Sequence, residues 1–382
     1  MMRVEEVTDG RDLHRYRDEW RALAVDSNGK NLFLTYEWLT TWLEAFWKDK
    51  PIAFLFLRNG DTLVGLAPLL RDDAGELWCS HSLVLPVNPH TPRSDLLCSG
   101  DRKELLAVLF AYLRNTRKSV RLALTHLDGA SSAMHALPEV AQDYHMTSCL
   151  LNSTTWPILR ITSDWETYLK SRSSHFQREY RRKTKNLERI GRVDWVRVTS
   201  RGECDAAMDD IFQIERNSWK EEAGTSFTAE TGLVSFYREL ARTCSEDGRL
   251  RIHLLYLDSK PLAHIYGMVY ENVYFALKTS YDQTFRNLAP GIVLFGYALR
   301  EAFELRFEAF DFLGQPSRWK NEMATDCGHR VDLCVYSRNL GRCRCCQMLQ
   351  QNLKPFIKRR IPFAITVTKA LANTIKSVRP TR

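Results

Sequence analysis

The sequence predicts an α/β (α+β) protein of two fused halves, each a mixed, mostly antiparallel sheet flanked by helices. The first observation is that one order of elements occurs twice: helical segments, paired apolar strand-like runs, a further helix and a closing strand. The second is size, because 382 residues suit two domains and an apolar content of 44% supplies a core for each. We expect one half over residues 1–152, another over 153–338, and a separate segment over 339–382.

The elements of the first half follow from its turn residues and its apolar spacing. The turn residues Asn59, Gly60 and Asp61 separate two apolar runs and indicate a hairpin. Leu105 and Leu109 belong to a set of leucines at helical spacing, which indicates a helix before the closing strand. In chain order we expect helical segments at 4–24 and 37–46, strands at 51–57 and 62–70, a short apolar run at 77–85, a helix at 102–114 and a strand at 120–127.

The second half repeats this order with different residues. Asp258, Ser259 and Lys260 form the first turn, and Pro290 and Gly291 open the helix, where proline is well tolerated. An apolar run at 156–161 begins this half and places the boundary near residue 152. We then expect helices at 164–189 and 204–222, strands at 251–257, 261–270 and 273–280, a helix at 292–305 and a strand at 308–312.

Positive charge is concentrated at the end of the chain. Residues 338–382 contain eleven Lys or Arg and no Asp or Glu. Removing these eleven charges from the formal net charge of +8 leaves −3 for the rest. We therefore expect no specific nucleic-acid partner for the body of the protein. The apolar residues of 339–382 fall at helical spacing, so we expect one or two basic amphipathic helices that contact an anionic membrane surface or pack on the body.

Cysteine usage and hydropathy indicate whether the protein binds a metal, spans a membrane or is secreted. Only Cys343, Cys345 and Cys346 cluster among ten cysteines, and they lack a second pair or a histidine at zinc-finger spacing, so we expect no metal. Scattered cysteines are typical of reduced core residues. No apolar run reaches 18 residues, and residues 1–13 lack the apolar core of a signal peptide. We expect a cytoplasmic protein that also reaches the inner membrane face through its tail.

The second half contains a series of short motifs at 165–192, 227–241, Tyr281-Asp282, Pro290-Gly291, 310–314 (FDFLG) and Trp319-Lys320. In this order the motifs resemble those of the CelD-like, or BioF2-like, acetyltransferases of the GNAT superfamily. The resemblance covers residues 31–337 and is strongest from Trp165 onward. It implies tandem GNAT halves, and it extends to Fem-type transferases, which share the Asp-Phe-x-x-Gly and aromatic-Lys pattern. One departure is Trp319, where the family usually has tyrosine.

The resemblance implies that acyl-CoA, with acetyl-CoA the simplest donor, binds at the loop before the helix that Pro290 opens. Free backbone N–H groups and the positive end of the helix dipole suit a pyrophosphate there. Gly291 permits close approach, and Arg286 adds a charged donor. Only these two residues approximate the GNAT signature Gln/Arg-x-x-Gly-x-Gly/Ala. An ordinary strand-to-helix loop is the alternative. The expected cofactor-binding residues are Arg286, Pro290, Gly291 and Ile292.

Direct attack of an amine on a thioester needs positioning, a proton acceptor and oxyanion stabilisation rather than a nucleophilic side chain. Asp311 follows an apolar strand and is the first candidate for the base, with a turn or cap residue as the alternative. Lys320 is a further catalytic candidate that is expected to bind an anionic acceptor group or a phosphate, with a solvated helix residue near Glu322 as the alternative. Glu215 is a second base or a solvated helix residue. A lone histidine in an apolar strand, His264, is interpreted as a core residue. The expected substrate-binding residues are Tyr281, Trp219 and Trp319.

Three functions remain open from the sequence. The first is transfer of an acyl group from acyl-CoA to an amine, on a sugar or amino-acid-like acceptor of envelope or polysaccharide metabolism. The second is Fem-like transfer from aminoacyl-tRNA to a peptidoglycan precursor. The third is a tandem GNAT scaffold without catalysis that binds a polysaccharide-synthesis partner or the membrane. The basic run at 178–192 is a solvated helix face or a rim that steers an anionic ligand.

Overall fold

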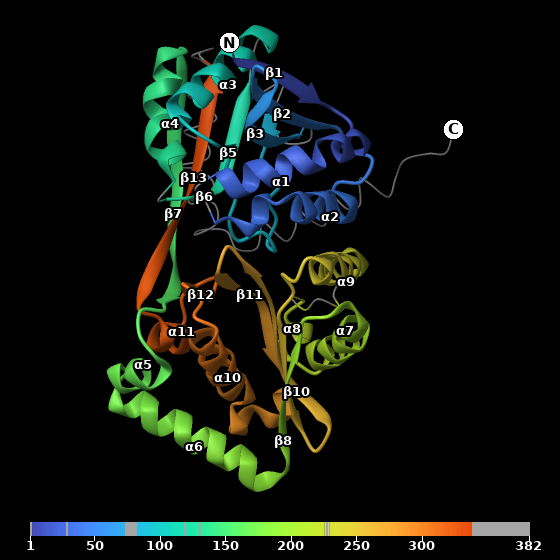
Figure 1. Cartoon of the computed structure of the whole chain (residues 1–382), viewed down its shortest axis with the longest axis vertical. Helices are drawn as coiled ribbons and strands as arrows, with labels where there is room; N and C mark the ends of the chain where they lie inside the picture. The colour runs from blue at the N-terminus through green and yellow to red at the C-terminus, as the bar shows by residue number, and fades with distance from the viewer. Residues whose placement is uncertain are drawn as a thin grey trace, which may run out of the picture.

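The computed structural model describes residues 2–27, 30–72, 82–117, 120–129, 131–224, 226, 228 and 230–337. Two lobes lie one above the other in Figure 1, and the long strands β7 (Met146–Arg160) and β13 (Asp326–Ser337) run between them. One sheet passes through both lobes in the order β1-β2-β3-β4-β6-β13-β7-β12-β11-β10-β9-β8. The expected basic helices at 339–382 and the cluster Cys343–Cys346 lie outside the described residues.

The first half builds its sheet on an apolar hairpin. In strand β2, six successive residues from Ile52 to Leu57 are buried, so both faces of the strand are covered. The short strand β4 pairs with β3 antiparallel and with β6 parallel, which makes the helix between β4 and β6 the crossover. The elements are β1 (Met2–Val7), α1 (Arg17–Asp26), α2 (Tyr36–Phe46), β2 (Ile52–Asn59), β3 (Thr62–Arg71), β4 (Ser82–Val84), β5 (Leu97–Cys98), α3 (Arg102–Thr116), β6 (Arg121–Asp128) and α4 (Ser132–Asp143).

The second half repeats this plan, as predicted. Strands β9, β10 and β11 form an antiparallel meander, and α10 carries the chain across to β12, which pairs with β11 in parallel. The elements are α5 (Trp165–Ser171), α6 (Ser174–Ile190), β8 (Val193–Val198), α7 (Arg201–Arg216), α8 (Trp219–Glu222), α9 (Thr231–Glu246), β9 (Ile252–Leu257), β10 (Lys260–Tyr270), β11 (Val273–Tyr281), α10 (Pro290–Glu304), β12 (Ala309–Asp311) and α11 (Arg318–Met323).

The two halves exchange strand segments. The beginning of β13 pairs with the end of β7 beside β12, and its end pairs with β6 of the first half. The boundary predicted near residue 152 therefore falls inside β7. Strands β7 and β13 pair with each other on both sides of residue 152. The two central strands are therefore shared by both halves.

The structure differs from the expected elements at several places. Residues 4–7 were expected to be helical, but Met2–Val7 form an edge strand on β2 with alternating exposed and buried residues. Strands β8 and β13 were not predicted, because both mix polar residues into short apolar runs and depend on pairing with distant strands. Helix α4 was not predicted either, and it contains Pro138.

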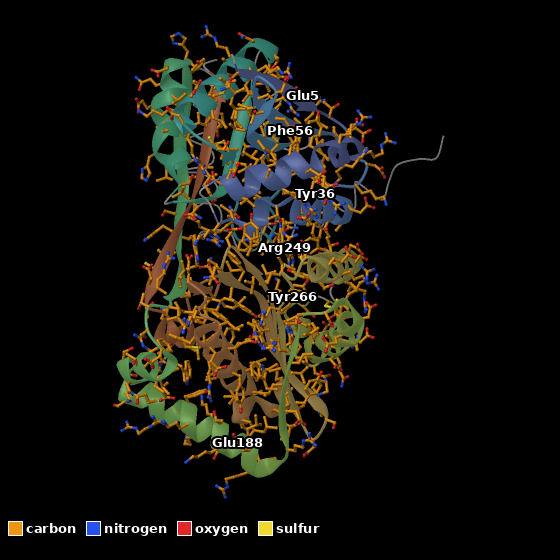
Figure 2. The ribbon with its side chains drawn as sticks, viewed as in Figure 1. Glu5, Tyr36, Phe56, Glu188, Arg249 and Tyr266 are labelled. Atoms are coloured by element: carbon orange, nitrogen blue, oxygen red, sulfur yellow. The ribbon has the colours of Figure 1, made fainter. Side chains whose placement is uncertain are left out.

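Aromatic packing fixes one half against the other. Phe33 and Trp38 of the first half belong to one core with Phe236 and Phe275 of the second, and Trp38 lies 5.4 Å from Phe236 between ring centroids. A buried ion pair crosses the same junction, where a carboxylate on α2, Glu37, lies 2.8 Å from the guanidinium of Arg249. Arg249 appears beside this junction in Figure 2. The relative position of the halves is thus set by the core itself.

Candidate functional site

A split between two parallel strands opens the cleft that holds most of the predicted site residues. Strands β11 and β12 pair only from Val273–Ala309 to Phe275–Asp311, after which β11 continues along β10 while the chain leaves β12. The resulting cleft has a volume of about 670 Å³. Its lining combines apolar side chains with four cations, Lys220, Lys278, Arg286 and Lys320.

A β-bulge lies where the strands separate. On β11, Ala276 faces Gly267 of β10 and Lys278 faces Tyr266, so Leu277 has no partner in this ladder. The bulge also changes which face the following side chains occupy. Ala276 packs in the core under α10, whereas Lys278 lies over the ring of Tyr237 from α9. Leu277 therefore lines the cleft at a point where β11 has no partner residue in the ladder with β10.

The helix α10 begins at the other end of the cleft. Its cap residue Ala289 is left-handed with φ of 52°, and its side chain provides no hydrogen bond. The amides of Ile292 and Val293 both donate to the carbonyl of Ala289. Because Pro290 has no N–H, Gly291 carries the remaining first-turn donor, and this donor has no backbone acceptor among the described residues. A Cβ at Gly291 would meet Tyr281 at an ordinary 3.5 Å, so packing alone does not require glycine.

Burial makes two of the lysines in the cleft unusually weak bases. The ammonium of Lys320 donates to the carbonyls of Phe312 and Leu313 at 3.3 and 2.8 Å. Removal from water disfavours the charged form and lowers the pKa of Lys320 to about 8. Burial, together with the positive charge of Lys220, also lowers the pKa of Lys278 to about 8. The cleft is thus a partly dry, cationic space that suits an anionic ligand.

Two buried hydroxyl groups in the lining add hydrogen-bonding capacity. Ser280 is only 4% exposed, and its Oγ has no hydrogen-bond partner among the described residues. The same holds for Oγ of Ser317 on the opposite wall. Because unpaired buried hydroxyls cost free energy, they are consistent with a ligand that completes their hydrogen bonds.

Most of the predicted residues meet in this cleft. Trp319 forms part of one wall and packs against Phe295 of α10 with ring centroids 4.7 Å apart. Trp219 is 51% exposed at the rim. Pro290 is the first residue of α10 and lies beside the lining rather than in it. The predicted residues that line the cleft are Trp219, Tyr281, Arg286, Gly291, Ile292, Trp319 and Lys320.

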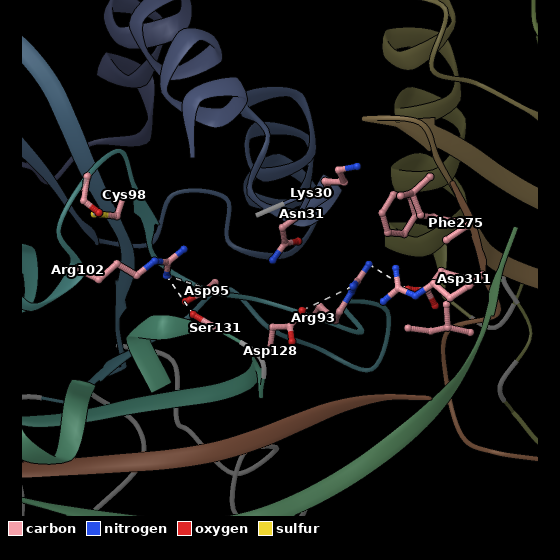
Figure 3. Close-up of a pocket in the computed structure, with 15 residues that line it drawn as sticks. Lys30, Asn31, Arg93, Asp95, Cys98, Arg102, Asp128, Ser131, Phe275 and Asp311 are labelled. Atoms are coloured by element: carbon pink, nitrogen blue, oxygen red, sulfur yellow. Dashed lines mark hydrogen bonds and ion pairs between the residues drawn. The ribbon is translucent and has the colours of Figure 1, made fainter. Parts of the chain in front are cut away.

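Asp311 faces away from the cleft, contrary to its expected place. It lines a separate cavity of about 390 Å³ between the halves. Figure 3 shows Arg93 of the first half extended between Asp128 and Asp311, and its guanidinium lies 3.1 Å from the Asp311 carboxylate. Trp156 also donates to that carboxylate at 3.2 Å. Burial raises the pKa of Asp311, and the alternation of β12 explains its orientation, because Phe310 and Phe312 occupy the other face.

Glu215 is fully buried behind the cleft, so the expectation of a solvated helix residue was wrong. Its carboxylate lies 2.9 Å from Nε2 of His264 and 3.5 Å from Nζ of Lys220. His264 is buried and hydrogen bonded, as expected of a core histidine. Glu215 does not line the cleft, but it pairs with Lys220, whose side chain does line the cleft.

Sequence reasoning missed Lys220, Lys278 and the bulge at Leu277. A lysine inside the apolar run of β11 was a signal for Lys278, since a cation is costly in a strand that is buried on both faces. Lys220 stands next to Trp219 in a polar segment and carries no comparable signal. The bulge depends on the register between β10 and β11, which the sequence does not display.

Comparisons with known proteins agree with this geometry. Residues 174–321 match the family model described as an acetyltransferase (GNAT) domain. No curated protein matches the chain significantly. Among solved structures, FemX superposes with a TM-score of 0.61 at 13% identity, covering 91% of this chain and 100% of its own.

Two further solved structures share the fold across both halves. One is the C-terminal DUF2156 domain of a putative lysylphosphatidylglycerol synthetase from Agrobacterium fabrum, with a TM-score of 0.53 at 11% identity, covering 89% and 97% of the two chains. The other is a conserved protein of unknown function from Bacteroides thetaiotaomicron VPI-5482, with a TM-score of 0.52 at 12% identity, covering 88% and 99%. At these identities the likeness concerns the fold.

Proposed function

We propose that this chain, an N-acyltransferase of the GNAT type with its GNAT domain at residues 174–321, moves an acyl group from acyl-CoA to an amine acceptor. Acetyl-CoA is the simplest donor. The observation that carries the proposal is the cleft between β11 and β12, which runs from an uncapped helix N-terminus to a bulge at the strand split.

The donor is proposed to lie along β11. Its pyrophosphate would bind at the first turn of α10, where the Gly291 amide, the helix dipole and Arg286 supply positive charge. Tyr281 contacts this turn, and Leu277 lies four residues earlier, or about 13 Å along an extended strand. An extended pantetheine arm spans such a distance, so we propose that the thioester lies near the bulge.

The chemistry would then be a direct attack by a neutral amine on the thioester carbonyl. The new C–N bond forms, the C–S bond breaks, and the CoA thiolate leaves. The backbone amide of Leu277 is proposed to donate to the developing oxyanion, because it lies outside the ladder at this point. Lys320 is proposed to accept the amine proton, since its lowered pKa of about 8 leaves part of the population neutral near physiological pH.

The acceptor is proposed to be an amine of envelope or polysaccharide metabolism. This proposal rests on the motif resemblance to CelD-like and BioF2-like acetyltransferases. Transfer from aminoacyl-tRNA remains the competing function, and FemX shares the fold of both halves. A scaffold without catalysis is the third outcome of the experiment below.

Thermal unfolding of the full chain distinguishes the donors. Acetyl-CoA at 100 times its Kd should stabilise the protein by about 2.7 kcal/mol. The Arg286→Ala variant should need a higher concentration for the same shift. A shift with aminoacyl-tRNA but with no acyl-CoA would move the proposal to the Fem-like reaction. No shift with either ligand would favour the scaffold. Mass-spectrometric screening for acylated amines would then identify the acceptor.

A membrane contact is a separate proposal about the basic segment at the end of the chain. The ten Lys or Arg of residues 339–382, without acidic residues, suit an anionic lipid surface at about 1 kcal/mol for each cation near the surface. No helix of the described residues is long and apolar enough to span a bilayer. Co-sedimentation with phosphatidylglycerol vesicles should be lost when residues 339–382 are removed. Equal binding by both chains would contradict the contact.

A further inference from the structure

Lys278 occupies a special place at the split of the sheet. It is the first residue after the bulge on β11, and it lines the cleft near the position proposed for the thioester. Its ammonium lies 5.9 Å from the ring centroid of Tyr237, on the side of the sheet away from α10.

Charged and titratable groups from four elements and one loop surround Lys278. Lys220 of α8 and Glu215 of α7 act on it electrostatically, and Lys278 in turn acts on His264 of β10. The ring of Tyr237 on α9 lies below it, and the hydroxyl of Tyr237 lies 3.0 Å from Nδ1 of His90. The acceptor side of the split is therefore built partly by the first half.

His90 is held in place by its own loop. Oδ1 of Asn88 accepts hydrogen bonds from the amide of His90 and from the hydroxyl of Thr91, which fixes a tight turn. Burial lowers the pKa of His90 to about 3, with the positive charges of Lys278 and Lys220 as further causes. His90 is thus neutral at physiological pH and closes the space around Lys278 without adding charge.

These surroundings change the reactivity of the Lys278 amine. Its pKa of about 8 leaves about a quarter of the amine neutral at pH 7.5, compared with about one part in a thousand for an ordinary exposed lysine. Two further lysines, Lys220 and Lys320, line the same cleft. Lys220 donates to the carbonyl of Thr279 and pairs with Glu215, while Lys320 donates to two carbonyls.

We propose that Lys278 is a site of self-acylation, at which the donor bound in the cleft acylates the lysine amine when no acceptor is present. This inference rests on the proposed function, since it requires acyl-CoA in the cleft. The neutral Nζ attacks the thioester carbonyl, a C–N bond forms and the C–S bond breaks. The amine releases one proton, which the departing CoA thiolate takes up as a thiol. No oxidant or further reactant is needed.

Acylation of Lys278 would limit the enzyme's own activity. The amide product carries no positive charge and adds an acyl group to a side chain that lines the cleft. An enzyme with abundant donor and no acceptor would therefore slow down, and the amide bond would keep it so until another enzyme removes the group.

The experiment incubates the full chain with ¹³C-labelled acetyl-CoA alone and maps acetylated lysines by mass spectrometry. At pH 7.5 Lys278 should be labelled on the order of 100-fold faster than exposed Lys48 and Lys103, which pair with Glu44 and Glu139. The labelling rate of Lys278 should rise with pH and level off above about pH 8, whereas the labelling rate of exposed lysines should continue to rise up to about pH 10.

Two variants give opposite shifts and test the electrostatic cause. Lys220→Met removes a neighbouring positive charge, so the pKa of Lys278 should rise and labelling at pH 7.5 should slow several-fold. Glu215→Gln removes the negative charge that favours the ammonium, so labelling should become faster. Lys278→Arg should abolish the labelled peptide.

The failures of the two proposals are distinguishable. Stabilisation by acetyl-CoA with no preference for Lys278, or with the label on Lys320 instead, would overturn self-acylation and leave the proposed function intact. No stabilisation and no labelling would overturn both for this donor. Labelling of Lys278 at the same rate in heat-denatured protein would show that the fold does not direct the reaction, and would also overturn it.

Discussion

A lysine becomes a base near neutral pH only where burial makes its charged form costly. Lys320 meets this condition because it lies inside the cleft and its ammonium is held by backbone carbonyls rather than by a carboxylate. The sequence predicted that Lys320 binds an anionic group, with a solvated helix residue near Glu322 as the alternative. The proposed role of Lys320 as proton acceptor follows from its buried environment and not from its residue type.

Replacing Lys320 tests that role through the pH profile. With the native protein, kcat/KM should rise with pH and level off above about pH 8, because only the neutral amine accepts a proton. Lys320→Met should lower the plateau by about 10²-fold or more and remove this ionisation, leaving that of the acceptor amine. An unchanged profile in Lys320→Met would exclude Lys320 as the proton acceptor.

Asp311 has a residue type that suits a catalytic base, but its position gives it a structural role. Its carboxylate is buried against Arg93 and Trp156, so it stabilises the junction between the halves instead of the reacting amine. We expect Asp311→Asn to destabilise the protein by about 3 kcal/mol, because a buried guanidinium loses its charged partner. Urea unfolding measures the loss, and the acetyl-CoA affinity of the folded fraction should not change. Native stability with lost activity would restore Asp311 as the base.

At the level of elements, helix α6 is placed by close packing on α10. A Cβ at Gly296 would meet the ring of Tyr180 at 2.1 Å, so only glycine admits this ring. The basic residues of α6 lie on its outer face, whereas Phe176 and Leu187 are buried. The predicted solvated helix face is therefore present, and the helix contributes to the wall that supports α10.

Substituting Gly296 should loosen this contact. Gly296→Ala is expected to lower the free energy of unfolding by about 1–3 kcal/mol through overpacking, although alanine favours helix formation. Gly202→Ala is a matched control, because a Cβ at that exposed helical position meets no atom within 4 Å. The two variants are compared by urea unfolding. Equal stability of both variants would contradict the packing described here.

For the whole molecule, the shared strands make the halves interdependent. Without β13, residues 1–152 would expose the edge of β6 and the side of β7, with unpaired backbone groups. We expect this fragment to aggregate when expressed alone, and the full chain to unfold in one cooperative transition. Calorimetry and size-exclusion chromatography check both outcomes. A soluble, folded fragment would show that the halves are independent.

The repeated strand–helix–strand order was predictable because local turn residues and apolar spacing determine it. The hairpin around Asn59–Asp61 and the helix that begins at Pro290 are examples of such local signals. Strand β13 was not predictable, since its identity depends on pairing with β6 and β7, which lie far away in the sequence. Seven of the candidate site residues line one cleft, because one loop and the two elements beside it carry most of them.

Binding of acetyl-CoA at the first turn of α10 is the central claim, and titration calorimetry tests it with one pair of variants. Gly291 and Gly202 are each the second residue of a helix, and a Cβ at either position meets no atom closer than 3.5 Å. We predict that Gly291→Val lowers the acetyl-CoA affinity at least tenfold while Gly202→Val binds like the native protein. Equal affinities for the two variants would contradict the claim.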